Sequence, residues 1–540
     1  MTEVQAETVT EAIVGRLKAA GATHIFGVPG GECNLDFIAA ADKLGLRFIL
    51  TRTETSAAIM ACVTAELTGA PGVAMTTRGP GLAAAANGVA YADLDRVPLL
   101  LIADGYEDDQ AYISHQRIDQ AALLSPMLRG WSDLRARDAV DEIERLIALA
   151  QAQPPGPVYL EVAGSRIRGR AEAVNRPAPA DARAAADAAG LEQARTMLRT
   201  AKRPLLLAGL QARTGRASDA LQRFVAQTGC PLLTTYKAKG VISEHDPRSL
   251  GLYAGGVAEQ AAIRSADLLI LYGFDPVEGP PQPWRYSDMA MLELTEHAFA
   301  QSPFEPDTSV VGPIDEALAA LADAAPPRRW TWADGELSAF KDAIWSAARV
   351  PAGPGISPEQ LVDAAIAALP ADARITIDAG AHMLPVLHLW RCGSPNQSLI
   401  SRGLSTMGFA LPAAVAASLI EPGRTTVAFT GDGGIMMCLG ELGTAVQSGA
   451  APIVIVFNDS SLTLIGAKQR RRQLAASGVD FSRADFAQIA RGFGWDAHSV
   501  AVQAELAPAF AAALASGRPT LIDVAVNPDQ YDAQILAIRG

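Results

Sequence analysis

The chain has 540 residues, of which 49% are hydrophobic and 19% charged, and its formal net charge is −13 at pH 7. One hydrophobic core does not grow to this size, so we expect several domains. An acidic protein without a broad basic field attracts neither nucleic acid nor an anionic membrane surface, and we expect neither as a general partner.

The N-terminal segment, residues 1–22, predicts an amphipathic helix and not a targeting signal, because acids lie near its start. No apolar run in the sequence reaches membrane-spanning length. The five cysteines are scattered without a CxxC pair, which is typical of buried thiols in a reducing compartment. We therefore expect a cytoplasmic protein.

Short strand-like runs alternate with helical patterns over residues 1–168, which predicts a first α/β domain. Its strands are expected at 24–30, 47–51, 72–77, 97–104 and 156–162. A stretch rich in Ala, Pro and Arg at 164–190 indicates a linker to the next domain.

The same alternation predicts a central domain over 186–325 and a third domain over 355–540, so the expected fold is three doubly wound parallel sheets. The expected strands are 203–209, 231–236 and 266–273, then 373–380, 425–434, 451–459 and 519–526. The central, Rossmann-like domain lacks a GxGxxG sequence after its first strand, so a bound FAD is not expected. In open parallel sheets ligands bind at the carboxyl ends of strands, which draws attention to the glycines there.

Two acids in the third domain follow neighbouring strands. Asp432 ends one strand within the sequence GDGG, and Asp459 ends the next strand after one intervening helix. A crossover of this length returns the chain beside its start, so both acids come out at one sheet edge. Glycines let the backbone approach a phosphate, and carboxylates bind a hard cation, so we predict a metal–phosphate site and not merely a helix cap and a turn.

Glu54 opens a helix whose next residues are small and apolar. An acid in this position is most often a first-turn residue favoured by the helix dipole. Burial among Ala57, Ala58 and Ile59 would instead raise its pKa toward a proton-sharing role. The position alone favours the capping role.

Five motifs together resemble the thiamine diphosphate-dependent enzymes of the acetolactate synthase and pyruvate decarboxylase group. They are IFGVPGGE, RTETSAAIMA, TTRGPG, STMGFALPAA, and GDGG with the later IVIVFND. They occur in the family's order over most of the chain. The resemblance implies a pyrimidine-binding first domain, a diphosphate-binding third domain, and a homodimer or homotetramer with active sites between two chains.

The resemblance also implies a role for each matching residue. Mg²⁺ would be held by Asp432, Asp459 and the carbonyl of Ser461. The cofactor would be contacted by Gly380, Ala381, His382, Gly433 and Gly434 at the diphosphate, Met407 as an apolar wedge, the Ser405 carbonyl at the 4′-amino group, and Leu464 and Ile465. Glu54 would bond the pyrimidine nitrogen, giving a pre-positioned base for decarboxylation of a 2-oxo acid.

Several positions depart from the family pattern and bear on the reaction. Asp459 stands where most of the family carries asparagine, and the catabolic, flavin-independent acetolactate synthases are more similar here. Simple decarboxylases place acids at the positions of Ile465 and Gly31. Without those acids, capture of the intermediate by a second carbonyl compound is favoured over release of an aldehyde. His115 and Gln116 argue the other way, because that loop supplies active-site groups in decarboxylases; a surface loop histidine is the alternative.

Lys468 and Arg78 replace uncharged residues of the family. Each could face an anionic group on the substrate, or belong to a solvated surface. The expected activity is acetolactate synthase-like carboligation of a 2-oxo acid with a second carbonyl compound. The alternatives are a non-oxidative decarboxylase or carboligase acting on a larger or anionic substrate, and a non-catalytic protein that binds the cofactor; the presence of Glu54 disfavours the last.

Overall fold

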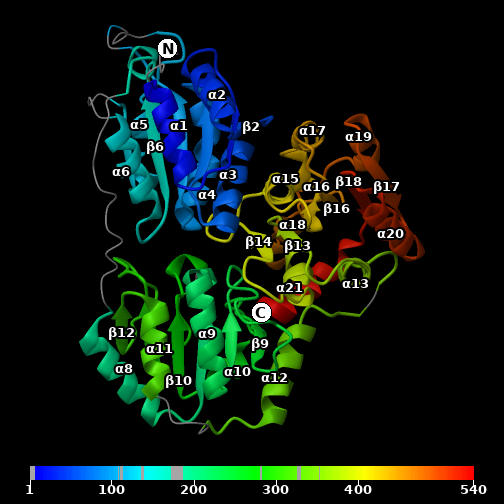
Figure 1. Ribbon diagram of the computed structural model, residues 1–540. Helices are drawn as coiled ribbons and strands as arrows, with labels where there is room; N and C mark the ends of the chain where they lie inside the picture. Colours follow the sequence, from blue (N-terminus) through cyan, green and yellow to red (C-terminus); the bar gives the residue numbers. More distant parts are fainter. Residues whose placement is uncertain are drawn as a thin grey trace.

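The computed structural model describes residues 7–107, 109, 114–134, 139–171, 186–279, 283–324, 330–351 and 353–540. Most of the predicted linker, residues 172–185, lies outside this description. The chain forms three α/β domains, coloured blue to cyan, green, and yellow to red in Figure 1. Each contains one six-stranded sheet whose described pairings are all parallel, which confirms the predicted fold class. None of the described helices is both long and apolar enough to span a bilayer.

The first sheet has the strand order β2-β1-β3-β4-β6-β5. Its strands are β1 (His24–Val28), β2 (Arg47–Leu50), β3 (Gly72–Thr76), β4 (Leu99–Asp104), β5 (Gly130–Ser132) and β6 (Pro157–Val162). One face packs on α1 (Val9–Ala19), α2 (Cys33–Leu44) and α6 (Ala139–Gln151), and the other on α3 (Glu54–Thr68) and α4 (Pro80–Leu94). Because helices cover both faces, a central strand such as β4 is buried along its whole length and is a continuous apolar run.

The third sheet repeats this order as β14-β13-β15-β16-β18-β17. Its strands are β13 (Arg374–Ile377), β14 (Ser398–Ile400), β15 (Thr426–Gly431), β16 (Ile453–Asn458), β17 (Asp496–Val500) and β18 (Thr520–Ala525). One face packs on α13 (Pro358–Ala368), α14 (Met383–Leu389), α20 (Leu506–Ser516) and α21 (Tyr531–Arg539). The other packs on α15 (Ala410–Ile420), α17 (Glu441–Ser448) and α19 (Phe486–Gly492). The short α16 (Asp432–Met436) and α18 (Thr463–Arg471) follow the carboxyl ends of β15 and β16.

The central sheet has a different order, β12-β11-β10-β7-β8-β9, which is the Rossmann arrangement. Its strands are β7 (Pro204–Ala208), β8 (Leu232–Thr234), β9 (Ser249–Leu252), β10 (Leu268–Tyr272), β11 (Met291–Thr295) and β12 (Thr308–Val311). Helices α8 (Ala188–Thr200), α9 (Gly215–Thr228) and α11 (Ile314–Ala324) cover one face. On the other face lie α10 (Gln260–Arg264) and α12 (Asp334–Ser346), the latter packed against β9.

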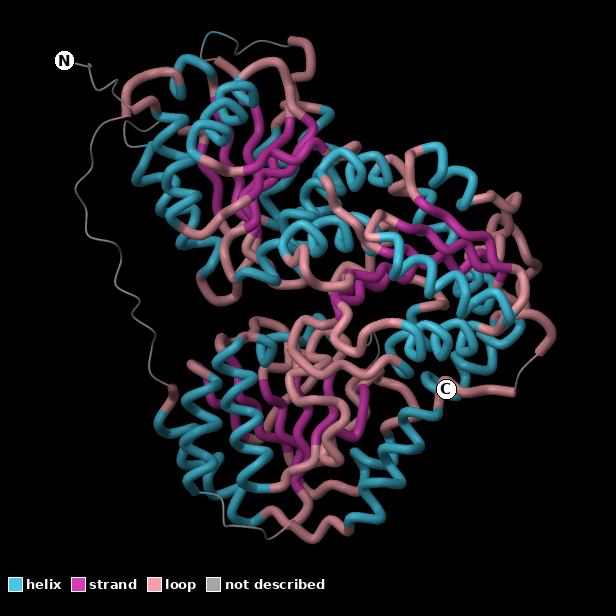
Figure 2. Tube along the Cα trace, turned by 45° about the vertical axis from the view of Figure 1, so that its right-hand side comes forward, coloured by secondary structure: helices cyan, strands magenta, loops and turns pink. Residues whose placement is uncertain are grey.

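The first and third domains share one hydrophobic core. Helix α3 is buried on every side from Ser56 to Ala65, because it packs on its own sheet and on α15 of the third domain. Helix α15 is apolar all round for the same reason. Figures 1 and 2 show these two domains side by side above the central domain.

Buried ion pairs join the central domain to the first. Lys237, whose side chain is 2% exposed, contacts Oε1 of Glu66 and lies 3.4 Å from Oδ1 of Asp95. Arg213 donates to the same Glu66 oxygen at 2.7 Å. Two central-domain cations thus face two first-domain acids in an interior where neither sign would be stable alone.

Candidate active site

The carboxyl ends of β13 and β15 mark the point where the strand order of the third sheet reverses. These strands are neighbours, but the chain runs outward from β13 to β14 before it returns to β15. In open parallel sheets ligands bind at such a reversal, in the crevice between the loops that follow the two strands. Asp378 follows β13 and Asp432 follows β15. We call this place, with Gly433, Gly434 and Asp459, the third-domain crevice.

Asp432 is oriented by backbone donors from two strand ends. Its Oδ1 accepts the N–H of Gly433 at 2.7 Å, and its Oδ2 accepts the N–H groups of Asp459 at 3.0 Å and Ser460 at 2.6 Å. Asp459 and Ser460 follow β16, and Asp432 follows β15. The carboxyl ends of these two neighbouring strands therefore meet, as the strand–helix–strand pattern predicts. Asp432 as a whole residue is 3% exposed, and this burial raises the pKa of its carboxyl group.

Asp459 is the second acid at this point, and its surroundings fit a bound cation. Its Oδ1 accepts the N–H of Ser461 at 3.2 Å, and its Oδ2 accepts the hydroxyl of Thr463 at 2.7 Å. Burial, together with the nearby charge of Asp432, raises the pKa of Asp459 to about 7. A divalent cation between two such acids would favour the charged form of both.

Among the described residues, no cluster of three or more His, Cys, Asp or Glu side chains forms a ready metal site. Two carboxylates with a backbone carbonyl nonetheless suit Mg²⁺, which usually takes one or two carboxylates and completes its shell with phosphate and water. Asp432, Asp459 and the Ser461 carbonyl therefore remain the predicted ligands.

Gly433 and Gly434 lie in the first turn of the short helix α16, directly after β15, and each lies against a neighbour. A Cβ at Gly434 would lie 2.4 Å from Oδ2 of Asp378, and one at Gly433 would lie 2.8 Å from Cδ2 of Leu462. The Met407 side chain is on the same side, with Cε 3.4 Å from the position of a Gly433 Cβ. A side chain at Gly434 would displace the Asp378 carboxylate, and the bare backbone of the two glycines would let a phosphate approach.

Asp378, which the sequence analysis did not single out, fastens the loops around the crevice. Its buried carboxylate accepts the N–H groups of Gly408 at 3.1 Å and Phe409 at 3.3 Å, and the hydroxyl of Thr430 at 2.9 Å. Burial raises the pKa of Asp378 to about 6. The residue fixes the Met407 loop relative to the turn after β15.

The predicted diphosphate loop, Gly380 to His382, lies at the same edge. His382 is buried, its ring lies 5.4 Å from the Phe457 ring, and Nδ1 would be 2.7 Å from a Cβ at Gly380. Burial lowers the pKa of His382 to about 4, so the imidazole is neutral near pH 7. Its Nε2 is buried without a hydrogen-bond partner, which leaves it free for a ligand. Ala381 is also buried.

The loop that carries Ser405 and Met407 is fastened to the first domain. The carboxylate of Asp95 accepts the N–H groups of Arg402 at 2.9 Å and Gly403 at 3.1 Å. Ser405 has a φ of 55°, and its hydroxyl donates to the Arg402 carbonyl at 3.0 Å. Asp95 is a further residue that the sequence analysis missed, because no glycine or strand-end motif marks it.

Glu54 begins α3 in the first domain, after the N-cap residue Thr53. It lies beside α4, where a Cβ at Gly81 would be 3.1 Å from its Oε1. Burial raises the pKa of Glu54. Across the described part of the chain, no hydrogen bond or ion pair joins Glu54 to the third-domain crevice.

The structure gathers a second group of predicted residues at the carboxyl edge of the first sheet. The group is Gly31, Arg78, His115 and Gln116. Arg78 lies over the Tyr106 ring at 5.3 Å, and the Tyr106 hydroxyl donates to the Gln116 carbonyl at 2.7 Å. Gly31 and His115 are exposed. This group and Glu54 belong to the first domain, whereas the metal and diphosphate residues belong to the third.

Helix α18 carries the last predicted residues. Leu464 is half-buried and packs on the third-domain core, Ile465 is 45% exposed, and Lys468 is exposed. The helix is tied to the crevice at its start through the Thr463 hydroxyl and Asp459.

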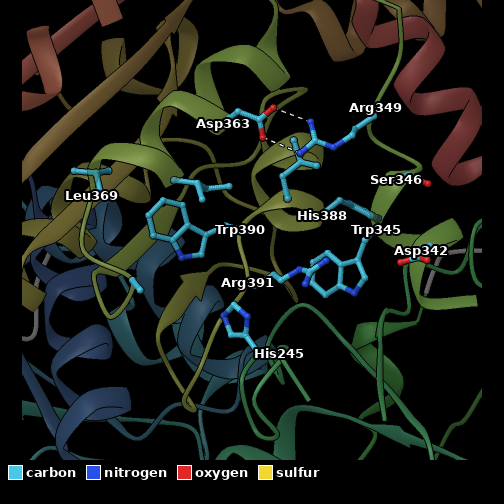
Figure 3. Close-up of a pocket in the computed structure, with 13 residues that line it drawn as sticks. His245, Asp342, Trp345, Ser346, Arg349, Asp363, Leu369, His388, Trp390 and Arg391 are labelled. Carbon is cyan, nitrogen blue, oxygen red and sulfur yellow. Dashed lines mark hydrogen bonds and ion pairs between the residues drawn. The ribbon is translucent and has the colours of Figure 1, made fainter. Parts of the chain in front are cut away.

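A separate cavity of about 490 Å³ lies near α12 and α14. Figure 3 shows Trp345, Trp390 and Arg391 around it, with the Arg349–Asp363 ion pair at 2.7 Å. Among the described residues that line it, none belongs to the predicted site. We therefore place the candidate active site at the third-domain crevice.

Three family models match the chain in order. They are described as "Thiamine pyrophosphate enzyme, N-terminal TPP binding domain" over residues 7–123, "central domain" over 191–321, and "C-terminal TPP binding domain" over 378–524. The third match contains the whole crevice, and the first contains Glu54.

Several acetolactate synthases are similar along almost their whole length. "Acetolactate synthase" of Bacillus subtilis (strain 168) is 29% identical over 538 residues, covering 96% of this chain and 93% of that protein. "Acetolactate synthase, catabolic" of Raoultella terrigena is 27% identical, covering 95% and 94%. "Acetolactate synthase isozyme 1 large subunit" of Escherichia coli (strain K12) is 27% identical, covering 97% and 94%.

Proposed function

Because the chain belongs to the thiamine pyrophosphate enzymes, with all three of their domains, we propose that it decarboxylates a 2-oxo acid and joins the product to a second carbonyl compound. The observation that carries this is the hydrogen bond between the Asp432 carboxylate and the Asp459 backbone N–H, beside the glycines at the start of α16 and at the reversal of a parallel sheet. That arrangement supplies what a metal-bound diphosphate needs. The similar proteins named acetolactate synthase support the reaction class.

The residues of the third-domain crevice fit thiamine diphosphate with Mg²⁺. Asp432, Asp459 and the Ser461 carbonyl would hold the metal, and the free Nε2 of His382 would meet the diphosphate. When bound, the cofactor supplies an acceptor for the electrons left when carbon dioxide departs. The protein would bind and orient it: Met407 would contact it as an apolar wedge, and the Ser405 carbonyl would accept from its amino group.

Glu54 would share a proton with the cofactor's pyrimidine nitrogen. Burial raises the pKa of Glu54, which suits that role because it favours the protonated form of the carboxyl group. Glu54 has no described contact with the crevice of its own chain. We propose that it serves the crevice of a second copy, in a homodimer or a homotetramer with active sites between chains.

Carboligation is favoured over simple decarboxylation because two positions that carry acids in simple decarboxylases carry none in this chain. Ile465, on α18, is an exposed aliphatic side chain, and nothing lies within 4 Å of the position of a Gly31 Cβ. Neither position offers an acid that would protonate the intermediate and release an aldehyde. A second carbonyl compound can then react with the intermediate.

The test is incubation of the purified protein with pyruvate, thiamine diphosphate and Mg²⁺, followed by product identification. Acetolactate would support carboligation, and acetaldehyde would support the non-oxidative decarboxylase instead. Absence of turnover with every 2-oxo acid tried would overturn both. Omission of Mg²⁺ in the presence of a chelator should abolish the reaction, which tests the metal separately.

A further inference from the structure

A cavity of about 280 Å³ lies beside helix α18, between the third and central domains. One face of α18 forms a wall, because Leu464, Ala467, Lys468 and Arg471 recur at the i, i+3, i+4, i+7 spacing. The remaining lining residues are Ala254, Gly255, Arg402, Ile535, Arg539 and Gly540. The cavity is thus built from four separate parts of the chain.

Four cationic side chains line this small volume: Arg402, Lys468, Arg471 and Arg539. Among the described lining residues, none is Asp or Glu. In the described chain, neither Lys468 nor Arg539 has a carboxylate at ion-pair distance. Like charges this close repel one another, and an anion placed between them would be stabilised by all four.

Arg402 is held in place by neutral groups, so its charge remains available. Arg402 donates to the Glu278 carbonyl at 2.8 Å and lies over the Tyr236 ring at 5.1 Å. Arg471 donates to the Gly540 oxygen at 3.2 Å. By contrast Arg470, the neighbour of Arg471 on α18, forms a two-bond ion pair with Asp532 at 2.7 and 2.9 Å and does not line the cavity.

The cavity lies close to the third-domain crevice. Thr463, at the start of α18, donates to Asp459, and Lys468 follows five residues later, which is about 7.5 Å along a helix. A molecule with its reacting carbonyl at the crevice and a short tail would reach Lys468. A volume of this size suits a small anionic group and is too small for a nucleotide or a flavin.

We propose that this cavity binds the distal anionic group of the substrate, a carboxylate, sulfonate or phosphonate remote from the reacting carbonyl. This inference rests on the proposed function and narrows it from 2-oxo acids in general to those with a second negative charge. It adds Arg402, Arg471 and Arg539 to Lys468 as residues that determine specificity.

The test compares kcat/KM of the holoenzyme for 2-oxobutyrate with kcat/KM for 2-oxoglutarate and 3-phosphonopyruvate, by release of carbon dioxide. At least one dianionic acid should exceed 2-oxobutyrate by about tenfold or more, the worth of a charge-assisted hydrogen bond. Lys468→Met and Arg539→Met should each lower that ratio about tenfold. Arg470→Met is the matched control, since it removes a cation from the same helix outside the cavity, and it should leave the ratio unchanged.

A binding measurement separates this inference from the proposed function. Inorganic phosphate should bind the holoenzyme in calorimetry, compete with the dianionic substrate, and bind more weakly to Lys468→Met and Arg539→Met. Phosphate that changes pyruvate turnover without competing would mean an effector site and would overturn the substrate assignment. Pyruvate turnover with no charge preference in the wild type would overturn it too, while leaving the proposed function intact. Absence of any turnover, with phosphate binding still weakened in the variants, would overturn the function alone.

Discussion

The Glu441 carboxylate, at the first residue of α17, accepts the backbone N–H of Thr53 at 3.1 Å, directly before Glu54. It also accepts the N–H of Arg52 at 3.2 Å and the hydroxyl of Thr444 at 2.7 Å. A buried acid of the third domain therefore fixes the start of α3 in the first.

Glu441→Gln should lower both stability and turnover. Every partner of Glu441 is a donor, so an amide NH₂ in its place leaves buried donors unpaired, at a cost of about 1–3 kcal/mol in the free energy of unfolding. Because Glu54 would shift, kcat should fall while the affinity for Mg²⁺ and thiamine diphosphate is kept. Gln447→Ala, on the same helix with a bond only to the Arg52 side chain, is the control. A variant with wild-type kcat would show that Glu441 does not position Glu54.

Mixed dimers should reveal whether Glu54 acts in a second chain. Glu54→Gln and Asp432→Asn should each lower activity by at least about a hundredfold, since one removes proton transfer and the other a metal ligand. A heterodimer of the two would contain one doubly defective site and one intact site, and should recover about half of the wild-type activity. Co-expression with two affinity tags isolates it. No recovery would place both residues in the site of one chain.

Asp459→Asn should change how metal binding depends on pH. The pKa of Asp459 is raised to about 7, so the group is mostly protonated at pH 6 and must lose that proton to bind Mg²⁺. The Kd of the wild type should therefore rise about tenfold for each pH unit below 7. An asparagine carries no such proton, and its Kd should be nearly flat over that range. Calorimetry measures both dependences. If the Kd for Mg²⁺ changed with pH in the same way in the wild type and in Asp459→Asn, Asp459 would not be the metal ligand that titrates.

Gly434→Ala should damage the crevice. Its new Cβ would lie 2.4 Å from Oδ2 of Asp378, a carboxylate already fixed by several donors, and relief of such overpacking costs about 1–3 kcal/mol. Weaker thiamine diphosphate binding should accompany the lower melting temperature. Gly423→Ala is a suitable control, because nothing lies within 4 Å of a Cβ there. Equal effects of Gly434→Ala and Gly423→Ala would argue against a close approach of Gly434 to the Asp378 carboxylate.

Lys237→Met should be the most destabilising of these changes. It leaves Glu66 and Asp95 buried with less positive charge, and breaking a buried pair in this way costs about 3–5 kcal/mol. Denaturant unfolding measures the loss. The exposed Arg349–Asp363 pair provides a comparison, and Arg349→Met should cost less than about 1 kcal/mol. A small effect of Lys237→Met would mean that the acids are protonated or solvated.

The sequence predicted the strands of the sheet interiors well and the edges poorly. Buried runs such as β4 and β16 carry an unbroken apolar signal, because helices cover both faces. Five of the strands not predicted, β5, β9, β12, β14 and β17, lie at sheet edges. Edge strands are short, and β5 and β17 are largely half-exposed, so their composition hardly differs from that of loops.

The residues of the candidate site also divide into those that leave a local signal in the sequence and those that do not. Asp432, Asp459 and the glycines between strand and helix were predicted because strand ends and turns leave local signals. Asp378, Asp95 and Glu441 were not, since each acts on backbone N–H groups that belong to loops or domains distant in the sequence. No local pattern records such partners, and only the packing of three domains brings them together.

The shared strand order of the first and third sheets has a consequence for the origin of the chain. Helices α3 and α15 each lie between the second and third strand of their sheets, and they pack against each other. Equivalent helices in mutual contact are the mark of a two-fold interface between identical units. This arrangement is what duplication of a dimer-forming domain would leave, with the central domain between the two copies in the sequence. The two outer domains differ in their chemistry, because one carries the acids of the crevice and the other carries Glu54.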